Sequence, residues 1–299
     1  MKLKAIFIFL GVLISTHLST MDLDEPSDDW TQTFHIQDMI LNEHSRHQNI
    51  VIFKNRTVGK VLMLDDIIQF AENDEFIYHE MIAHVPLLLH PKPKKILIIG
   101  GGDGAVLREV LKHDSVDQVT VVELDGKIVD VCQKHFPHLS KNAFEDSRVR
   151  LLIDDGFKYL KKTHSYYDVI LVGTTDPFGP AKPLFKKQFY KLCYTALTPD
   201  GVLVSQNGSP LIQLDNLIKF KEMKNEIFEN SSFYFCPAPS QLTGMKAFSI
   251  SFKGKGHIKP SLKELNKRYK QINGELKYYS PETHLSSFYV PKYLKDLLK

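Results

Sequence analysis

The stretch KILIIGGGDGAVLREVL, residues 95–111, decides the fold predicted for this chain. It begins with the apolar run Ile96 to Ile99, continues through a glycine-rich turn at residues 100–104, and ends in a helical pattern. A strand buried on both faces of a sheet needs such an unbroken run of apolar residues. Glycines after the strand permit a tight turn and let backbone N–H groups approach a ligand closely. The stretch therefore predicts a strand–turn–helix unit that binds a ligand at its turn.

Apolar runs and helical patterns keep alternating after this unit. Further strands are expected at 119–122, 149–153, 169–172 and 202–205, with helices at 126–135, 157–162 and 186–196. Alternation of this kind predicts an α/β fold, a Rossmann-like and mostly parallel sheet with helices on both faces. We assign residues 81–299 to this Rossmann-like domain.

A different pattern precedes the sheet. Short apolar runs between Phe34 and Leu64, separated by polar turn residues, predict a small antiparallel β-domain over residues 27–80. Near its end, apolar residues from Phe76 to Val85 recur at helical spacing, which predicts a helix there.

The first twenty residues allow two interpretations. Two lysines precede the apolar run Ala5–Ile14, as in a secretory signal. That run is too short to span a bilayer, which needs about 20 residues, so no stable membrane association is expected. Residues 1–20 are therefore either an export signal or a segment ahead of a working start at Met21.

Composition narrows the possible partners. The 299 residues include 38 Lys and Arg against 35 Asp and Glu, a net charge of +3, without a long basic block. This argues against nucleic-acid binding and favours a small-molecule partner. The three cysteines are widely spaced, so we expect reduced thiols and a cytoplasmic protein, unless residues 1–20 export it. The 13 histidines lack the spacing of a helical metal site, and no metal is expected.

An acidic residue strengthens the glycine turn as a binding motif. Glu123 ends the next predicted strand, twenty residues after Asp103, where a carboxylate can accept hydrogen bonds from a ribose diol. A dinucleotide is a less suitable ligand, because the glycine spacing is not GxGxxG and the negative charge of Asp103 would lie beside the pyrophosphate. A nucleoside with a positive centre, such as an S-adenosyl sulfonium compound, fits better.

The next two strands end in further candidate site residues. Asp154, Asp155 and Gly156 follow the third strand, where one carboxylate can accept the exocyclic amine of adenine and Asp154 suits a helix N-cap. The fourth strand leads into a loop, residues 173–180, that two prolines and a glycine make rigid. Asp176 in this loop is a candidate to hold a cationic substrate.

These motifs resemble those of the polyamine aminopropyltransferases, the spermidine synthases and their relatives. The segment DEFIYHEMIAHVPLLLHPKPKKILIIGGGDGAVLREVLKH, residues 74–113, carries most of the resemblance. It continues from about Trp30 to the C-terminus through HQNIVIF, VLMLDDIIQ, VVELD, DDGF, TTDPFGPAKPLF and VSQNG. It implies decarboxylated S-adenosylmethionine as co-substrate without another cofactor, a polyamine acceptor such as putrescine, and homodimers or homotetramers.

The resemblance also implies roles for single residues. Implied donor-binding residues are Gln48, Gly100, Gly102, Asp103, Glu123, Asp155, Gly156 and Pro180. Implied residues of the acceptor side are Tyr78, His79, Asp103, Asp176 and Gln241, the last at a position where the family has a tyrosine.

One departure from the family pattern concerns catalysis. The family motif runs Asp-x-[Ser/Thr]-Asp-Pro, and its first aspartate is regarded as the catalytic base. Here that position is Gly173, so we expect aminopropyl transfer to be impaired or altered in its acceptor. Asp176, or a water held by Tyr78, would replace the base only weakly.

Two other functions stay open. A non-catalytic homologue would bind a polyamine, methylthioadenosine or the decarboxylated donor as a sensor. An S-adenosylmethionine-dependent methyltransferase would share the fold, but Asp103 disfavours it, because full methionine presents its own carboxylate at that place.

Overall fold

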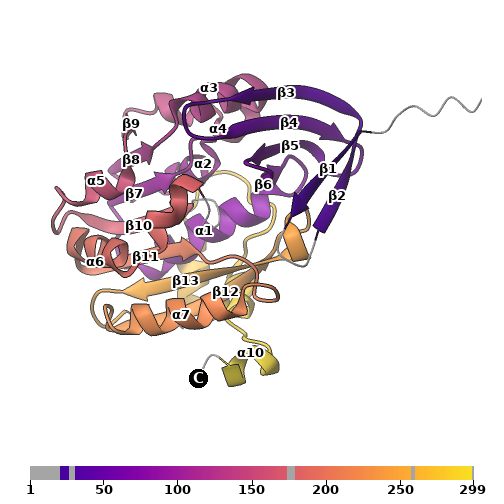
Figure 1. The fold of residues 1–299 in the computed structure, drawn as a ribbon. Coiled ribbons are helices and arrows are strands. Elements are labelled where there is room, and N and C mark those ends of the chain that lie inside the picture. Colours follow the sequence, from indigo (N-terminus) through magenta and orange to yellow (C-terminus); the bar gives the residue numbers. More distant parts are fainter. Residues whose placement is uncertain (1–20, 27–30, 174–178, 257–259, 298–299) are drawn as a thin grey trace, which may run out of the picture.

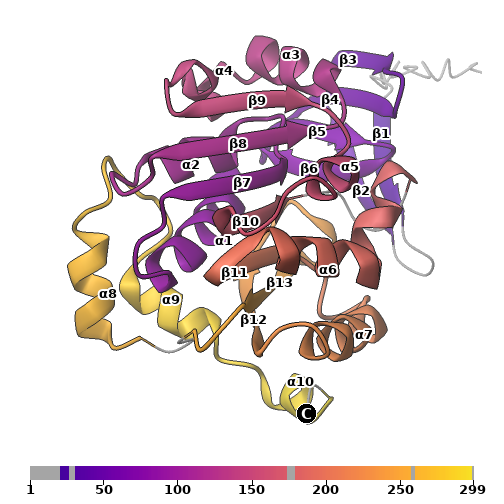
Figure 2. The same cartoon turned by 90° about the vertical axis from the view of Figure 1, so that its left-hand side faces the viewer.

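The computed structural model describes residues 21–26, 31–173, 179–256 and 260–297, so the first twenty residues lie outside it. Its largest element is a seven-stranded sheet in the order β12-β13-β11-β10-β7-β8-β9, whose edge strands β9 and β12 are labelled in Figure 2. The strands are β7 Lys95–Gly100, β8 Gln118–Glu123, β9 Val149–Ile153, β10 Tyr167–Gly173, β11 Leu197–Gln206, β12 Asn230–Pro237 and β13 Met245–Phe252.

Most of this sheet is parallel, as the sequence predicts. Neighbouring strands from β9 to β11 pair in parallel, whereas β13 pairs antiparallel with both β11 and β12. Side chains along β7 alternate between two cores: Ile96 and Ile98 join one cluster, and Leu97 and Ile99 join the other. Burial on both faces explains why this strand is apolar throughout.

Helices cover both faces of the sheet (Figure 1). One face packs against α1 Glu75–Leu89, α2 Ala105–Leu111, α8 Leu262–Tyr269 and the region of α9 Pro281–Ser287. The other packs against α5 Gly156–Leu160 and α6 Lys187–Ala196, with α7 Leu214–Asn225 over β12. The remaining helices are α3 Gly126–His135, α4 Pro137–Ser140, η1 Ala143–Glu145, η2 Gly179–Phe185, η3 Leu242–Gly244 and α10 Lys292–Leu297.

The N-terminal part is antiparallel, also as predicted. Four strands, β3 Asp38–His44, β4 Asn49–Asn55, β5 Gly59–Leu64 and β6 Ile67–Ala71, pair in sequence order. A two-stranded ribbon, β1 Met21–Pro26 and β2 Thr31–Ile36, accompanies them (Figure 1). Asp65 and Asp66 form the β5–β6 turn with left-handed φ values of 48° and 65°, the conformation that two-residue hairpin turns require.

A shared apolar cluster joins the two sheets. Ile50 and Leu62 from the N-terminal sheet pack with Ile128, Val131 and Phe136 from α3 and its C-terminal end. The four-stranded sheet is thereby held over the carboxyl ends of the central strands, where a ligand is expected.

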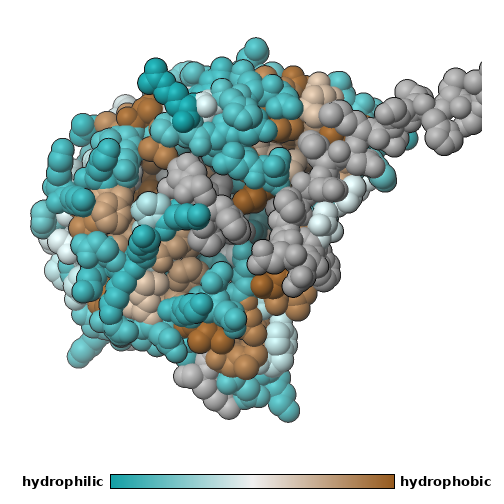
Figure 3. Space-filling model, viewed as in Figure 1, coloured by the Kyte–Doolittle hydropathy of each residue, from teal (hydrophilic) through white to brown (hydrophobic). Residues whose placement is uncertain are grey.

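Two further observations concern the described residues. Cys132, Cys193 and Cys236 are buried free thiols. Within the described ranges, no helix is both long and apolar enough to cross a bilayer. Hydrophilic side chains dominate the described part of the face shown in Figure 3.

Candidate active site

A pocket with about 970 Å³ of space lies at the carboxyl ends of β7, β8, β9 and β10. β7 is also where the strand order reverses, with β8 on one side and β10 on the other. Ligands of open α/β sheets bind at this place. Eight of the sequence-predicted residues line the pocket together: Gln48, Gly100, Gly102, Asp103, Glu123, Asp155, Gly156 and Gly173.

The glycine turn places a carboxylate at one end of the pocket. Gly101 and Gly104 adopt left-handed φ values of 87° and 78°. A Cβ on Gly104 would also lie 2.6 Å from Cβ of Ser140, so a larger residue does not fit. The Asp103 carboxylate accepts a 2.7 Å hydrogen bond from the backbone N–H of Ala105, which holds it at the start of α2.

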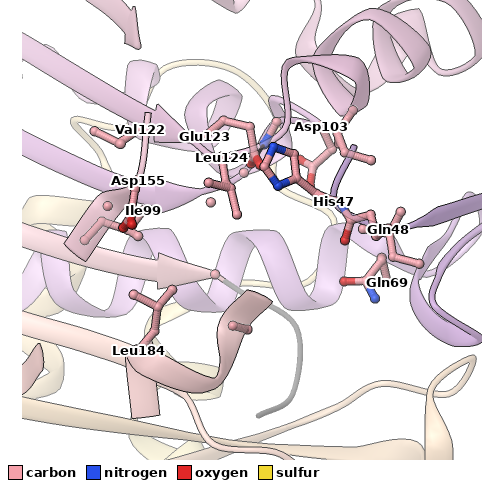
Figure 4. Close-up of a pocket in the computed structure, with 18 of the residues that line it drawn as sticks. His47, Gln48, Gln69, Ile99, Asp103, Val122, Glu123, Leu124, Asp155 and Leu184 are labelled. Carbon is pink, nitrogen blue, oxygen red and sulfur yellow. Dashed lines mark hydrogen bonds between the residues drawn. The ribbon is translucent and has the colours of Figure 1, made fainter. Parts of the chain in front are cut away.

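Glu123 lies at the centre of the pocket wall (Figure 4). Its two carboxylate oxygens accept hydrogen bonds from the backbone N–H groups of Gly102 and Asp125, both at 3.0 Å. Burial raises the pKa of Glu123 to about 7, and these two hydrogen bonds only partly oppose the effect. The side chain is therefore a fixed acceptor that changes its charge near neutral pH.

Asp155 both lines the pocket and caps a helix. Its side chain accepts hydrogen bonds from the backbone N–H groups of Phe157 and Lys158 at the start of α5. The N-cap predicted for Asp154 is wrong, because α5 begins one residue later than that prediction requires. A Cβ on Gly156 would lie 2.7 Å from Cγ2 of Ile99, so glycine is needed where α5 meets β7.

The N-terminal sheet closes the pocket from the opposite side. The turn before β4 is fixed by Asp125, whose carboxylate accepts hydrogen bonds from Ser45 Oγ at 2.5 Å and Gln48 Nε2 at 3.1 Å. Figure 4 shows His47 and Gln48 of this turn facing the pocket across from Asp155. Asp125 is absent from the sequence-based site, although its place directly after the VVEL strand end was a usable signal.

A second, smaller compartment adjoins the first. It contains about 420 Å³ of space, and both compartments are lined by Gln69, Asp103 and Gly173. The second is also lined by Tyr78, His79 and Gln241, three residues implied for the acceptor side, and by Ile67, Ile68, Gln206 and Lys246. Of these, Gln69, Gln206 and Lys246 were not found from the sequence, although a lysine within the apolar strand β13 is an irregularity that marks it.

His79 is the buried polar side chain of this compartment. Its Nδ1 lies 2.7 Å from Oε2 of Glu75, which also pairs with Arg108. Burial lowers the pKa of His79, but the hydrogen bond with Glu75 and the charge of Asp103 outweigh it, so that the pKa is raised above its usual value. The nearby acids therefore favour the protonated form of this imidazole.

Gln241 reaches the compartment from the loop between β12 and β13. Asp74, just before α1, holds this loop by accepting hydrogen bonds from the backbone N–H and the hydroxyl of Ser240, at 2.7 and 2.9 Å. Gln241 Nε2 then donates to the backbone oxygen of Gln69 at 2.8 Å. The start of α1, the middle of β6 and this loop thus meet at one wall.

Gly173 ends β10 at the junction of the two compartments. A Cβ at this position would lie 3.7 Å from Cδ1 of Ile82 and 3.8 Å from the hydroxyl of Tyr78, which is ordinary contact. The glycine is therefore not required for packing. Asp176 lies outside the described residues, and Pro180 lies in η2 with its side chain outside the description.

No group of three or more His, Cys, Asp or Glu side chains in the described ranges is arranged to hold a metal ion. The site consists instead of buried carboxylates, amides and apolar walls. Such a set can bind a nucleoside in the first compartment and a small amine or acid in the second.

Comparison with known proteins gives consistent results. Residues 75–259 match the spermine/spermidine synthase domain, and residues 23–72 match the spermidine synthase tetramerisation domain. The polyamine aminopropyltransferase of Pseudomonas syringae pv. tomato is 41% identical, over 88% of this chain and 92% of the relative. Polyamine aminopropyltransferase 1 of Pseudomonas aeruginosa is 40% identical with the same coverage.

Solved structures are similar over nearly the whole chain. A crystal structure of spermidine synthase in complex with the transition state analogue AdoDATO has a TM-score of 0.87 and 36% identity, covering 93% of this chain and 94% of the other. Spermidine synthase from Thermotoga maritima has a TM-score of 0.84 and 34% identity, with the same coverage.

Proposed function

The chain belongs to the spermidine and spermine synthase family, and we propose that it transfers an aminopropyl group from decarboxylated S-adenosylmethionine to an amine. The lining of the first compartment supports this donor. Glu123 would accept hydrogen bonds from the ribose hydroxyls, and Asp155 would accept one from the adenine amine. Asp103, between the two compartments, would hold the donor's propylamine. The amine acceptor would then occupy the second compartment.

The reaction needs little help at its leaving group. The acceptor nitrogen attacks the propyl carbon beside the sulfonium, and the carbon–sulfur electron pair stays on sulfur to give neutral methylthioadenosine. The nucleophile is harder to prepare, because an alkylammonium has a pKa of about 10.4. A positioned base typically contributes about 10²–10⁴-fold by accepting the proton.

We propose further that putrescine is a slow acceptor. The observation that carries this is Gly173, which places no carboxylate at the junction of the two compartments although the space there accepts a side chain. Correct placement of the two substrates still accelerates the reaction, since oriented reactants reach effective molarities on the order of 10⁵–10⁸ M. We therefore expect slow transfer rather than none.

The test follows methylthioadenosine release from decarboxylated S-adenosylmethionine and putrescine. We expect Gly173→Asp to raise turnover at least tenfold, because its carboxylate would reach the amine beside Tyr78. Gly173→Asn is the matched control, with a side chain of the same size that cannot act as a base. Equal rates in the wild type and both variants would mean that the slow transfer has a cause other than Gly173. Wild-type turnover comparable to that of an ordinary spermidine synthase would refute the proposal that putrescine is a slow acceptor.

A binding protein without turnover is the second candidate. The observation that favours it is that the first compartment has the carboxylates of Glu123 and Asp155, whereas Gly173 provides none where the two compartments meet. This candidate predicts that calorimetry detects binding of methylthioadenosine. It also predicts that no methylthioadenosine forms from decarboxylated S-adenosylmethionine with putrescine, spermidine, cadaverine or agmatine. Formation of S-adenosylhomocysteine from S-adenosylmethionine would instead indicate a methyltransferase.

A further inference from the structure

A lysine lies buried between helix α7 and the central sheet. Lys224 is in the last turn of α7 and is 1% exposed. Its Nζ donates hydrogen bonds to the hydroxyl of Ser205, at 2.7 Å, and to the hydroxyl of Ser249. It also lies 4.6 Å from the centre of the Tyr190 ring. None of these partners is an acid, so among the described residues no carboxylate pairs with this amine.

The strands beneath Lys224 contribute hydroxyls where apolar side chains are usual. Ser205 of β11 lies opposite Ser249 of β13, and Ser251, two residues further along β13, lies opposite Ser231 of β12. Opposed residues, and residues two apart on a strand, share one face of a sheet. Both opposed pairs of hydroxyls are 3.0 Å apart. The four serines and the lysine therefore form one polar cluster under α7.

A cavity with about 580 Å³ of space borders this cluster. Its lining includes Lys224, Ser231 and Ser249, together with the apolar side chains of Phe233 and Val290. No acid is found among the described residues that line it. Its lining shares no residue with that of the first or the second compartment, so it is a separate space.

Burial also sets the charge of Lys224. It lowers the pKa of this amine to about 7, because the ammonium loses the water that stabilises it. Tyr190 and Cys193 face the amine from α6 and are neutral, since burial raises the pKa of both. Lys221, one turn earlier on α7, lines the same cavity. A negatively charged group in the cavity would therefore favour the ammonium form of Lys224.

We propose that this cavity binds a small carboxylate with a short apolar chain. The carboxylate accepts a hydrogen bond from Lys224, and the chain contacts Phe233 and Val290. A buried ammonium is costly without an ion partner, and hydrogen bonds between ionised groups are the stronger ones. The apolar walls favour a ligand with a hydrocarbon part over an inorganic anion. This site is independent of the proposed aminopropyl transfer.

The experiment compares butyrate with 1-butanol, which has the same chain length without a charge, and with inorganic phosphate, which has charge without a chain. Each is titrated calorimetrically at pH 6.5 into protein saturated with methylthioadenosine, so that the first compartment is occupied. We expect butyrate to bind at least tenfold more tightly than either of the other two.

A variant of Lys224 tests the cause. Lys224→Met keeps an unbranched side chain and removes the charge, so butyrate should bind at least tenfold more weakly. The affinities for 1-butanol and methylthioadenosine should stay within twofold, which also shows that the variant is folded. The control is Lys219→Met, at an exposed lysine of α7, which should change none of these affinities.

Proton uptake is a second measurement of the same contact. Butyrate stays ionised between pH 6 and 8.5, whereas Lys224 loses its proton as pH rises through about 7. The affinity for butyrate should therefore fall by about tenfold for each pH unit above 7, and binding at pH 7.5 should take up a proton. Lys224→Met should show neither effect.

Equal binding of butyrate and 1-butanol would overturn the proposal, and so would unchanged butyrate affinity in a folded Lys224→Met. Phosphate that binds as tightly as butyrate would overturn the carboxylate class. Each of these results is obtained without aminopropyl transfer, so none depends on the proposed function.

Discussion

Glu123 is an acidic residue whose environment sets its charge near neutral pH. Burial at the end of β8 raises its pKa to about 7, so the free protein holds a mixture of carboxylate and carboxylic acid. In the proposed complex, two ribose hydroxyls would donate hydrogen bonds to this side chain and would thereby select its carboxylate form. Ligand binding should therefore lower this pKa and release a proton.

The expected result is pH-dependent nucleoside affinity. Methylthioadenosine should bind more weakly as pH falls below 7, by about tenfold for each pH unit, and its affinity should level off above pH 7. Calorimetric titration from pH 5.5 to 8 measures this change.

Glu123→Gln is the control for this prediction. It should remove the pH dependence and weaken binding at pH 8 by about 1.5–3 kcal/mol, the typical contribution of a hydrogen bond to a charged group. A flat affinity profile in the wild type would mean that the ribose does not contact this carboxylate.

At the scale of elements, helix α1 connects the site with the C-terminal segment. Tyr78 and His79 line the second, smaller compartment, whereas the next residue, Glu80, points to the chain after α8. Its carboxylate accepts hydrogen bonds from the backbone N–H groups of residues 277, 278 and 279, at 2.8, 2.9 and 2.7 Å. One buried acid thus satisfies three donors of a segment without regular structure.

We expect Glu80→Gln to destabilise the fold. Its amide nitrogen cannot accept a hydrogen bond, so at least one N–H group loses its partner, at a cost of about 1–3 kcal/mol. Denaturant unfolding measures the loss, and Glu282→Gln at an exposed position is the control. The affinity for methylthioadenosine should stay within twofold, because Glu80 does not line either compartment. An unchanged unfolding midpoint would contradict this role.

At the scale of the whole molecule, the site requires both sheets. The central sheet provides the strand ends, and the N-terminal sheet supplies Gln48, Leu62 and Gln69 as the opposite wall. The contact between Gln48 and Asp125 and the shared apolar cluster hold the two parts together. The position of the N-terminal sheet therefore determines the shape of the pocket.

The N-terminal region also suggests assembly. Because residues 23–72 match a spermidine synthase tetramerisation domain, we expect homodimers or homotetramers of the 34.3 kDa chain. Sedimentation velocity at micromolar concentration should give a mass that is two or four times the chain mass. A monomer at these concentrations would contradict the prediction.

Much of the fold was predictable because its elements are defined by local patterns. The helix Gly126–His135 and the strand Val149–Ile153 begin and end where the sequence predicts them. Strands buried on both faces, such as β7, are apolar throughout and therefore stand out in the sequence. The donor-side residues follow the same logic, because parallel strands bring their carboxyl ends together at one edge.

The sequence by itself determined the α/β class, the glycine turn and the acids at the strand ends. Only the tertiary structure placed Gln69, Gln241 and Lys246 in one compartment, since they come from β6, a loop and β13. No local periodicity relates such residues, because their proximity depends on how the N-terminal sheet and α1 pack against the central sheet. The structure also decided that Asp155 caps α5, since that depends on where the helix begins.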